Sequence, residues 1–278
     1  MDMTLDHLRE WIGREERASE MLTPALTERF LATFDRAGES DPGAEAPLML
    51  HHALCQPVAA TSQLGPDGHP KRGGFLPPVT LPRRMWAGGE IAFHSAPRVG
   101  QTVSRRSVID DVHIKQGRSG SLCFVTVTHA YATEGRALLT ERQDIVYREA
   151  PSPGATPKAP PPAPEGASRR DVDPSPELLF RYSALTFNSH RIHYDHPYVT
   201  GEEGYPGLVV HGPLQAALLV QYAADLHGAA PARFRFRGLS PVFSGSPLVL
   251  HATEEDGAMT LWSAAPGAPV AMEATAEW

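Results

Sequence analysis

Alternating apolar and polar positions predict β-strands in two separate stretches of the chain. The first runs from residue 102 to 149, where three β-branched segments are separated by the turn sequences GRSG and EGR. The second runs from residue 232 to 278 and contains four shorter segments, with EEDG as its clearest turn. Strands joined by short turns predict an antiparallel meander in each stretch.

Helical periodicity predicts one long helix before the second meander and two helices at the N-terminus. The segment VVHGPLQAALLVQYAADLHG, residues 209–228, has Pro213 just inside its start and Gly228 past its end, where these residues favour helix termini. Its surface has almost no polar face, which is typical of a helix surrounded by a sheet. The N-terminal helices are expected from Leu5 to Glu20 and from Thr27 to Phe34.

A proline-rich segment divides the chain. Residues 150–176 are typical of a semi-extended linker, which leaves an N-terminal unit at 1–149 and a C-terminal unit at 177–278. Both units contain a strand, a Pro…Gly turn and a long hairpin in the same order, which is a weak internal repeat. The repeat predicts an α+β fold with two sheets, each curled around a helix. In the first unit the segment PPVTLPRRMWAGG, residues 77–89, is expected in place of that helix, so the second unit should carry the chemistry.

Composition narrows the class of protein. A formal charge of −7 over 278 residues argues against a nucleic-acid-binding surface. Cys55 and Cys123 give no disulfide framework and no metal-ligand spacing. The polar, acidic start is unlike a signal peptide, and no apolar run approaches the ~20 residues that span a bilayer. We therefore expect a cytoplasmic protein with neither nucleic acid nor membrane as a partner.

The segment FNSHRIHYDHPYV, residues 187–199, contains three histidines and an aspartate within seven residues. His190, His193 and His196 are spaced by three, as zinc or iron ligands on one helix face would be. Pro197 opposes a long regular helix, however, and no second set of ligands follows, so we expect no metal and no cofactor. A polar loop with structural histidines is the plain alternative.

The start of the long helix favours a reaction site over that alternative. A helix N-terminus offers unpaired N–H groups and a positive dipole end, which together can receive an oxyanion. Because Pro213 has no N–H, the amide donors available at this helix start are those of Gly212 and Leu214. Gly212 has no side chain, so a carbonyl group can approach it closely. His211 precedes them in the chain.

The string ALTFNSHRIHYDHPYV, followed by GYPGLVVHGPL, resembles the MaoC-like (R)-specific enoyl-thioester hydratases and hydroxyacyl-thioester dehydratases. The pattern of that family is D-x-N-P-x-H-x-D, then an apolar pair and H-G. His193 matches its catalytic His, Asp195 the later Asp, and His211-Gly212 the H-G. The sequence departs from the pattern at three positions, where Asp, Asn and Pro are replaced by Asn188, His190 and Arg191.

Further segments resemble one branch of that family. GFLPPVTLPRRMWAGGE and FRYSALTFN are similar to the two-hotdog branch that contains mesaconyl-C4-CoA (3-methylfumaryl-CoA) hydratases and type 2 mitochondrial dehydratases. The resemblance extends over most of residues 75–277. It implies a double hotdog, here with an N-terminal helical extension, and a degenerate first unit beside a catalytic second one. It also suggests that Asn188 and His190 form a variant catalytic set.

The resemblance implies reversible addition of water to an enoyl-CoA thioester without a cofactor. His193 is expected to move the proton, because imidazole acts as acid and base near neutrality. Asn188 would hold water or orient His193, and His190 is the candidate second base. The Gly212 amide is assigned to the thioester oxygen. Asp195 either fixes the imidazole tautomer or caps a turn, and His211 either takes part or anchors the helix start.

The expected substrate is mesaconyl-C4-CoA and the product citramalyl-CoA. Arg191, Arg83 or Arg84 would bind a distal carboxylate or the CoA phosphates, and Trp86 would line the acyl pocket or pack in the core. Itaconyl-CoA hydration and the 3-hydroxyacyl-thioester dehydration of fatty acid synthesis are alternatives. A non-catalytic acyl-thioester-binding protein is a third, of another class. We expect a homodimer.

Overall fold

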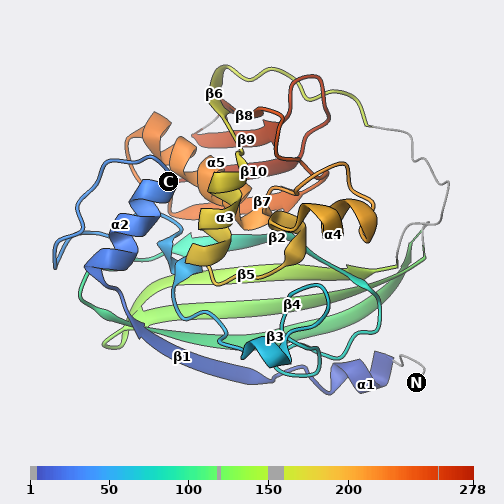
Figure 1. Ribbon diagram of the computed structural model, residues 1–278. Coiled ribbons are helices and arrows are strands. Elements are labelled where there is room, and N and C mark those ends of the chain that lie inside the picture. The colour runs from blue at the N-terminus through green and yellow to red at the C-terminus, as the bar shows by residue number, and fades with distance from the viewer. Residues whose placement is uncertain (1–4, 118–119, 150–159, 256) are drawn as a thin grey trace.

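All the strands of the fold form one antiparallel sheet. The computed structural model describes residues 5–117, 120–149, 160–255 and 257–278. Within them the strand order is β1-β3-β4-β5-β2-β7-β10-β9-β8-β6 (Figure 1). None of the described helices combines the length and apolar character needed to cross a membrane.

The first half supplies one side of this sheet. Its elements are α1 (Leu5–Arg9), β1 (Glu15–Met21), α2 (Pro24–Thr33), the 3₁₀ turns η1 (Leu50–Ala53) and η2 (Thr61–Gln63), β2 (Arg83–Phe93), β3 (Thr102–Gly117), β4 (Gly120–Thr133) and β5 (Arg136–Arg148). The long strands β3, β4 and β5 confirm the first predicted meander.

The second half repeats the same order of elements. They are β6 (Ser168–Val172), α3 (Pro176–Leu185), η3 (Arg191–His193), α4 (His196–Gly201), α5 (Gly212–His227), β7 (Arg233–Gly238), β8 (Leu248–Glu255), β9 (Ala258–Ala264) and β10 (Met272–Glu277). Each half is thus an edge strand, a short helix, a helical segment and four further strands. The halves join where β2 pairs with β7, from Gly88↔Arg237 to Ala92↔Arg233.

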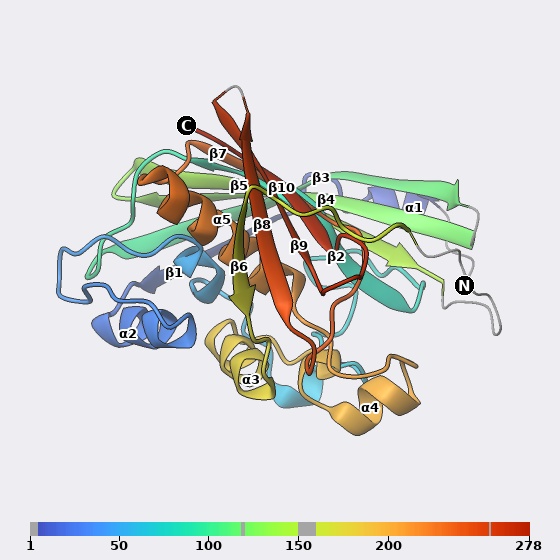
Figure 2. The same ribbon diagram turned by 90° about the horizontal axis from the view of Figure 1, so that it is seen from above.

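Helix α5 forms the centre of the core, as its apolar sequence predicts. Leu214, Ala216, Leu219 and Val220 are completely buried, and α5 packs against β8, β9 and β10. Figure 2 shows α2, α3 and α4 along one side of the molecule. Burying an almost wholly apolar helix against a sheet is the main source of stability in such a fold.

The first-half counterpart of α5 is η1, not the segment 77–89. The sequences LMLHH at 48–52 and LVVHG at 208–212 occupy corresponding places, after α2 and α3 respectively. Residues 83–89 instead belong to β2, which carries a bulge between Trp86 and Gly88. Glycine is required there because a Cβ on Gly89 would lie 2.1 Å from the carbonyl oxygen of Arg142 on β5.

The predicted N-terminal helix from Leu5 to Glu20 is wrong beyond Arg9. Residues 15–21 form β1, which pairs with β3. Its polar sequence EERASEM lacks the apolar alternation of a strand because β1 lies at the edge of the sheet, where most of its side chains face solvent. Cross-strand ion pairs, such as Glu16 with Arg105, replace apolar contacts there.

The predicted linker also contains regular structure. Ser168–Val172 form β6, which pairs with β8 at the opposite edge of the sheet. The preceding residues 150–159 lie outside the described part of the chain. A short polar edge strand has no sequence signature of its own, because its hydrogen bonds come from a partner far along the chain.

Candidate active site

The histidine-rich loop runs from the end of α3 to α4. Phe187 adopts a left-handed conformation with φ 51°, which turns the chain out of α3. The Oδ1 of Asn188 then accepts a hydrogen bond from the backbone N–H of His190 at 3.0 Å. Asn188 therefore shapes the loop through its oxygen, and its amide N–H groups remain as donors.

His193 is buried and held in one tautomer. Its Nδ1–H donates to the backbone carbonyl of Val209 at 2.7 Å, so Nε2 carries the lone pair. Burial lowers the pKa of His193 to about 4 because a low-dielectric surrounding disfavours the charged ring. At neutral pH His193 is therefore a neutral base with Nε2 available.

His211 places that base beside the N-terminus of α5. The rings of His193 and His211 stack with centroids 3.6 Å apart. The Nε2 of His211 contacts the hydroxyl of Ser183 at 2.8 Å, which ties the helix start to α3. His211 immediately precedes Gly212, whose amide lies in the first helical turn and has no acceptor within the helix.

Two residues from the first half, Asp67 and His69, complete the cluster, and neither was predicted from the sequence. The ring of His69 lies 4.0 Å from that of His190, and His190 meets His193 edge-on at 5.3 Å. The Nδ1 of His69 contacts the carboxylate of Asp67 at 2.9 Å. The sequence PDGH at 66–69 was the available signal, but a short polar turn motif does not reveal its partner.

The electrostatics of this row of rings favour neutral imidazoles. Burial, and then the nearby Arg84 guanidinium, lower the pKa of His69 to about 4. Burial, followed by His69 and His193, lowers the pKa of His190. Burial alone would raise the pKa of Asp67, but its contacts with His69 hold that pKa below its usual range. Asp67 is therefore an ionised acceptor that fixes the orientation of His69.

The two loops are held together by backbone contacts. The backbone N–H of Arg191 donates to the carbonyl of Asp67 at 2.9 Å. A Cβ on Gly68 would lie 1.9 Å from the carbonyl oxygen of Ser189, so only glycine allows this approach. The turn at 66–69 thus belongs to the same site as the histidine loop.

Asp195 and Arg191 bind each other in the structure. The Asp195 carboxylate accepts from the backbone N–H of Tyr198, which caps α4, and pairs with the Arg191 guanidinium at 2.8 Å. Arg191 also donates to the carbonyl of Pro66 and lies over the ring of Tyr198. The carbonyl of Val209, not Asp195, sets the tautomer of His193, and Arg191 is committed to protein partners.

Arg83 and Arg84 differ in whether the guanidinium is already paired with a carboxylate of the protein. Arg83 donates to the carbonyl of Glu203 and faces its carboxylate at 3.4 Å. Arg84 lies close enough to His69 and His190 to affect both pKa values, and it forms no ion pair within the described residues. Of the three expected arginines, Arg84 alone lies at the site without a carboxylate partner among the described residues, although its guanidinium also interacts with the Tyr147 hydroxyl.

Trp86 and Leu214 belong to the apolar core at the start of α5. A Cβ on Gly212 would lie 3.1 Å from the Trp86 ring, so the indole packs directly against the helix start. The other neighbours of Trp86 are Phe236, stacked at 4.5 Å, and His52. The Leu214 side chain is completely buried, which leaves its backbone amide as the group able to meet a substrate.

The site also contains a set of donors with metal-ligand spacing. Asp67, His69 and His190 each offer an atom within 4.8 Å of the others. The positive Arg84 guanidinium beside His69 opposes a cation there. Within this set a hydrogen bond joins Asp67 to His69, and the His69 ring packs on the His190 ring.

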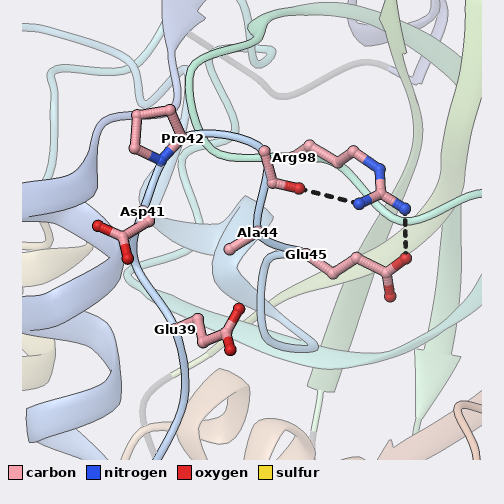
Figure 3. A pocket seen from close by; sticks show the side chains of 7 residues that line it. Glu39, Asp41, Pro42, Ala44, Glu45 and Arg98 are labelled. Atoms are coloured by element: carbon pink, nitrogen blue, oxygen red, sulfur yellow. Dashed lines mark hydrogen bonds and ion pairs between the residues drawn. The ribbon is translucent and has the colours of Figure 1, made fainter.

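A surface pocket elsewhere lacks these features (Figure 3). It is lined by the loop after α2, including Glu39, Asp41 and Glu45, together with Arg98. The Arg98 guanidinium is bonded to the carbonyl of Gly43 and to Glu45. The remaining acidic lining would repel an anionic acyl-CoA.

Comparison with solved structures defines the class of fold. A MaoC-like dehydratase matches with a TM-score of 0.71 over 98% of this chain and 99% of its own, at 13% identity. A conserved hypothetical protein of Mycobacterium tuberculosis, described as a double hotdog, matches with a TM-score of 0.58 over 95% of both chains, at 15% identity. The fold is a double hotdog, as the sequence analysis predicted.

The particular family follows from sequence. The model for hydroxyacyl-thioester dehydratase type 2 matches residues 49–244. A relative from Chloroflexus aurantiacus, mesaconyl-C(4)-CoA hydratase, is 45% identical over 271 residues, or 96% of each chain. The chain belongs to the hydroxyacyl-thioester dehydratase type 2 family.

Proposed function

We propose that the protein is a hydro-lyase that hydrates mesaconyl-C4-CoA to citramalyl-CoA reversibly. The observation that carries the reaction class is the neutral His193 ring, stacked on His211 at the N-terminus of α5. This arrangement places a base with a free lone pair beside a set of unpaired amide donors. The 45% identity to a mesaconyl-C(4)-CoA hydratase over nearly the whole chain supports the substrate.

The base acts on water. As the water oxygen attacks the β-carbon of the enoyl thioester, Nε2 of His193 takes up one of its protons. The bond of Nδ1–H to Val209 persists throughout and favours the imidazolium that forms. The proton then passes from Nε2 to the α-carbon, which restores the neutral ring and completes the addition of one water.

The enolate between these steps needs an electrostatic partner. Negative charge develops on the thioester oxygen, and the Gly212 and Leu214 amides at the start of α5 stabilise it with the helix dipole. Pro213 contributes no donor. Trp86, packed against Gly212, keeps this end of the site apolar, which strengthens the interaction.

The remaining polar groups position the water and the base. The amide N–H groups of Asn188 hold the attacking water, since an amide cannot accept a proton at neutral pH. Asp67 fixes His69, His69 packs on His190, and His190 packs on His193. His190 is thus the second titrating group and borders the reacting ring.

Arg84 recognises the free carboxylate of the substrate. A guanidinium binds a carboxylate through two parallel hydrogen bonds. Arg83 and Arg191 already have partners, whereas Arg84 adds an unpaired positive charge beside His69. This charge favours a dicarboxylic acyl group over a plain enoyl chain.

A panel of enoyl-CoA thioesters tests the proposal, with loss of enoyl-thioester absorbance as the measurement. We expect turnover of mesaconyl-C4-CoA to exceed that of itaconyl-CoA and crotonyl-CoA. Preference for itaconyl-CoA would assign the first alternative. Preference for plain enoyl thioesters, especially on acyl carrier protein, would indicate the dehydratase of fatty acid synthesis. Tight binding without turnover of any thioester would identify a non-catalytic binding protein.

We also propose a cytoplasmic homodimer. The acidic composition and the CoA-linked substrate support the location. Phe180 and Phe187, 64% and 60% exposed on α3 and the turn after it, offer an apolar contact surface. Light scattering after size exclusion measures the mass, and a monomer at micromolar concentration would disprove the dimer.

A further inference from the structure

A buried hydroxyl on α3 contacts the ring that stacks on the proposed base. Ser183 lies in the last turn of α3, and its side-chain oxygen approaches the Nε2 of His211 at 2.8 Å. The His211 ring in turn stacks on the His193 ring, with centroids 3.6 Å apart and an angle of 19° between the planes. Tyr182 meets His211 edge-on at 5.0 Å. His211 is therefore held by a hydroxyl and by two neighbouring rings.

These groups are closed to solvent. His211 is 0% exposed, Ser183 is 6% exposed and His193 is 7% exposed. Within the described residues no carboxylate pairs with His211, so an imidazolium at this position would be a buried charge without a counter-charge. His211 is therefore neutral, and one of its two ring nitrogens carries a lone pair.

The pairing of buried polar atoms decides which nitrogen carries the lone pair. In the described part of the chain the Ser183 hydroxyl has no second hydrogen-bond partner, and the Nδ1 of His211 is buried without any partner. If the hydroxyl donates to Nε2, only the N–H at Nδ1 is left unpaired. If Nε2–H donates to the hydroxyl instead, the hydroxyl hydrogen and the Nδ1 lone pair are both left unpaired. Since each buried unpaired group is unfavourable, the hydroxyl is the donor and Nε2 is the acceptor.

We propose that Ser183 is a positioning residue, which donates its hydroxyl proton to His211 and so keeps a neutral ring stacked on His193 throughout the reaction. The inference rests on the proposed hydratase reaction and adds to it a residue that does not touch the substrate. In this tautomer Nε2 is the one nitrogen of His211 that could take up a second proton, and the hydrogen bond from Ser183 occupies it.

The neutral ring is important when His193 is charged. Once Nε2 of His193 has taken a proton from water, this ring is an imidazolium, and the π-face of a neutral aromatic ring stabilises a cation that lies over it. A proton on His211 would add a second positive charge at a ring distance of 3.6 Å. Like charges that close repel each other strongly in a buried site. Ser183 therefore favours the charged form of His193 without taking part in substrate binding.

The tautomer of His211 can be measured without any substrate. In the wild-type protein labelled with ¹⁵N-histidine, long-range ¹H–¹⁵N correlation spectra distinguish a proton on Nδ1 from a proton on Nε2. We expect His211 to carry its proton on Nδ1. The signals that disappear in His211→Phe assign the ring, and the signals that shift in Ser183→Ala assign it independently. A proton on Nε2 would overturn the role of Ser183, whatever the activity of the protein.

Steady-state kinetics test the catalytic consequence. Ser183→Ala should lower kcat for thioester hydration by about tenfold. It should leave KM nearly unchanged, because the hydrogen bond supports the charged form of His193 and not the bound substrate. Ser183→Thr keeps the hydroxyl and should restore most of kcat. A merely structural role would lower Tm in Ser183→Ala and leave kcat unchanged, which would also overturn the proposal.

The matched control is Thr186→Val, which removes another buried hydroxyl from the end of α3. The Thr186 hydroxyl donates to the carbonyl of Tyr182 at 2.8 Å, and that carbonyl also accepts from the backbone N–H of Thr186. Thr186→Val should therefore retain the kcat of the wild type. Equal losses in Thr186→Val and Ser183→Ala would assign the effect to packing and overturn the proposal. A wild-type protein that turns over no thioester would refute the hydratase reaction itself, whereas turnover together with a proton on Nε2 of His211 would refute the role of Ser183 alone.

Discussion

The Nδ1 of His193 and the carbonyl oxygen of Val209 lie 2.7 Å apart, and Val209 belongs to the segment that leads into α5. One hydrogen bond therefore fixes the tautomer of the His193 imidazole and its position relative to the N-terminus of α5. The same bond directs the lone pair of Nε2 away from the backbone. The first prediction concerns this atom.

Replacement of His193 by alanine should lower kcat for hydration by about 10² to 10⁴-fold, the usual contribution of a general base. Asn188 and the α5 amides remain, so binding of the thioester should change little. Steady-state kinetics together with a substrate-binding titration measure both effects. Full activity in His193→Ala would exclude this residue as the base.

On the acid side of the pH–rate profile, activity should be lost only at an unusually low pH. His193 acts as a base only when neutral, and burial lowers its pKa to about 4. Activity should therefore persist as the pH falls through 6.5, the ordinary pKa of histidine, and should decline only as it approaches about 4. The profile of kcat/KM gives the value in the free enzyme. An inflection near pH 6.5 would mean that His193 is solvated.

Loss of the Asp67 carboxylate should lower activity indirectly, through its effect on His69 and His190. In Asp67→Asn the His69 ring loses its charged partner, so we expect kcat to fall by about tenfold with a smaller change in KM. The acid limb should also move, because the charge of Asp67 favours protonation of His190. A merely structural role would lower Tm and leave the pH profile unchanged.

Arg84→Gln should reduce selectivity rather than chemistry. Loss of a charged hydrogen-bonding partner for the substrate carboxylate should lower kcat/KM for mesaconyl-C4-CoA by about 10- to 100-fold. Turnover of crotonyl-CoA, which lacks that carboxylate, should be unaffected. Arg83→Gln is the matched control, since its guanidinium is paired with Glu203. Equal losses on both substrates would assign Arg84 to the fold or to CoA.

Stability should fall as the pH is lowered from about 6.5 to about 4. In that range an unfolded histidine binds a proton, whereas folded His129 stays neutral, because burial lowers its pKa to about 4. Protonation therefore favours the unfolded chain. Thermal unfolding at several pH values measures the slope, and His129→Gln should make it shallower. An unchanged slope in that variant would contradict the low pKa of His129.

The first meander and the central helix could be predicted from the sequence, as could the four strands of the second stretch, although β7 pairs with β10 and not with β8. Strands β3, β4 and β5 and helix α5 bury their apolar faces, so their periodicity is written in the residues that form them. The same holds for the order His193, His211, Gly212, because a loop leading into a helix N-terminus is a local feature. These parts depend on neighbours in the chain.

Features that depend on partners far along the chain could not be predicted locally. Edge strands β1 and β6 have polar sequences and become strands by pairing with β3 and β8. Asp67 and His69 reach His190 because the chain folds back across more than a hundred residues. Arg191 and Arg84 are the same residue type, and both were expected to bind the substrate. In the structure Arg191 pairs with Asp195, whereas Arg84 lies beside the histidines. A residue type specifies which interactions a side chain can make, and the fold decides which partner is within reach.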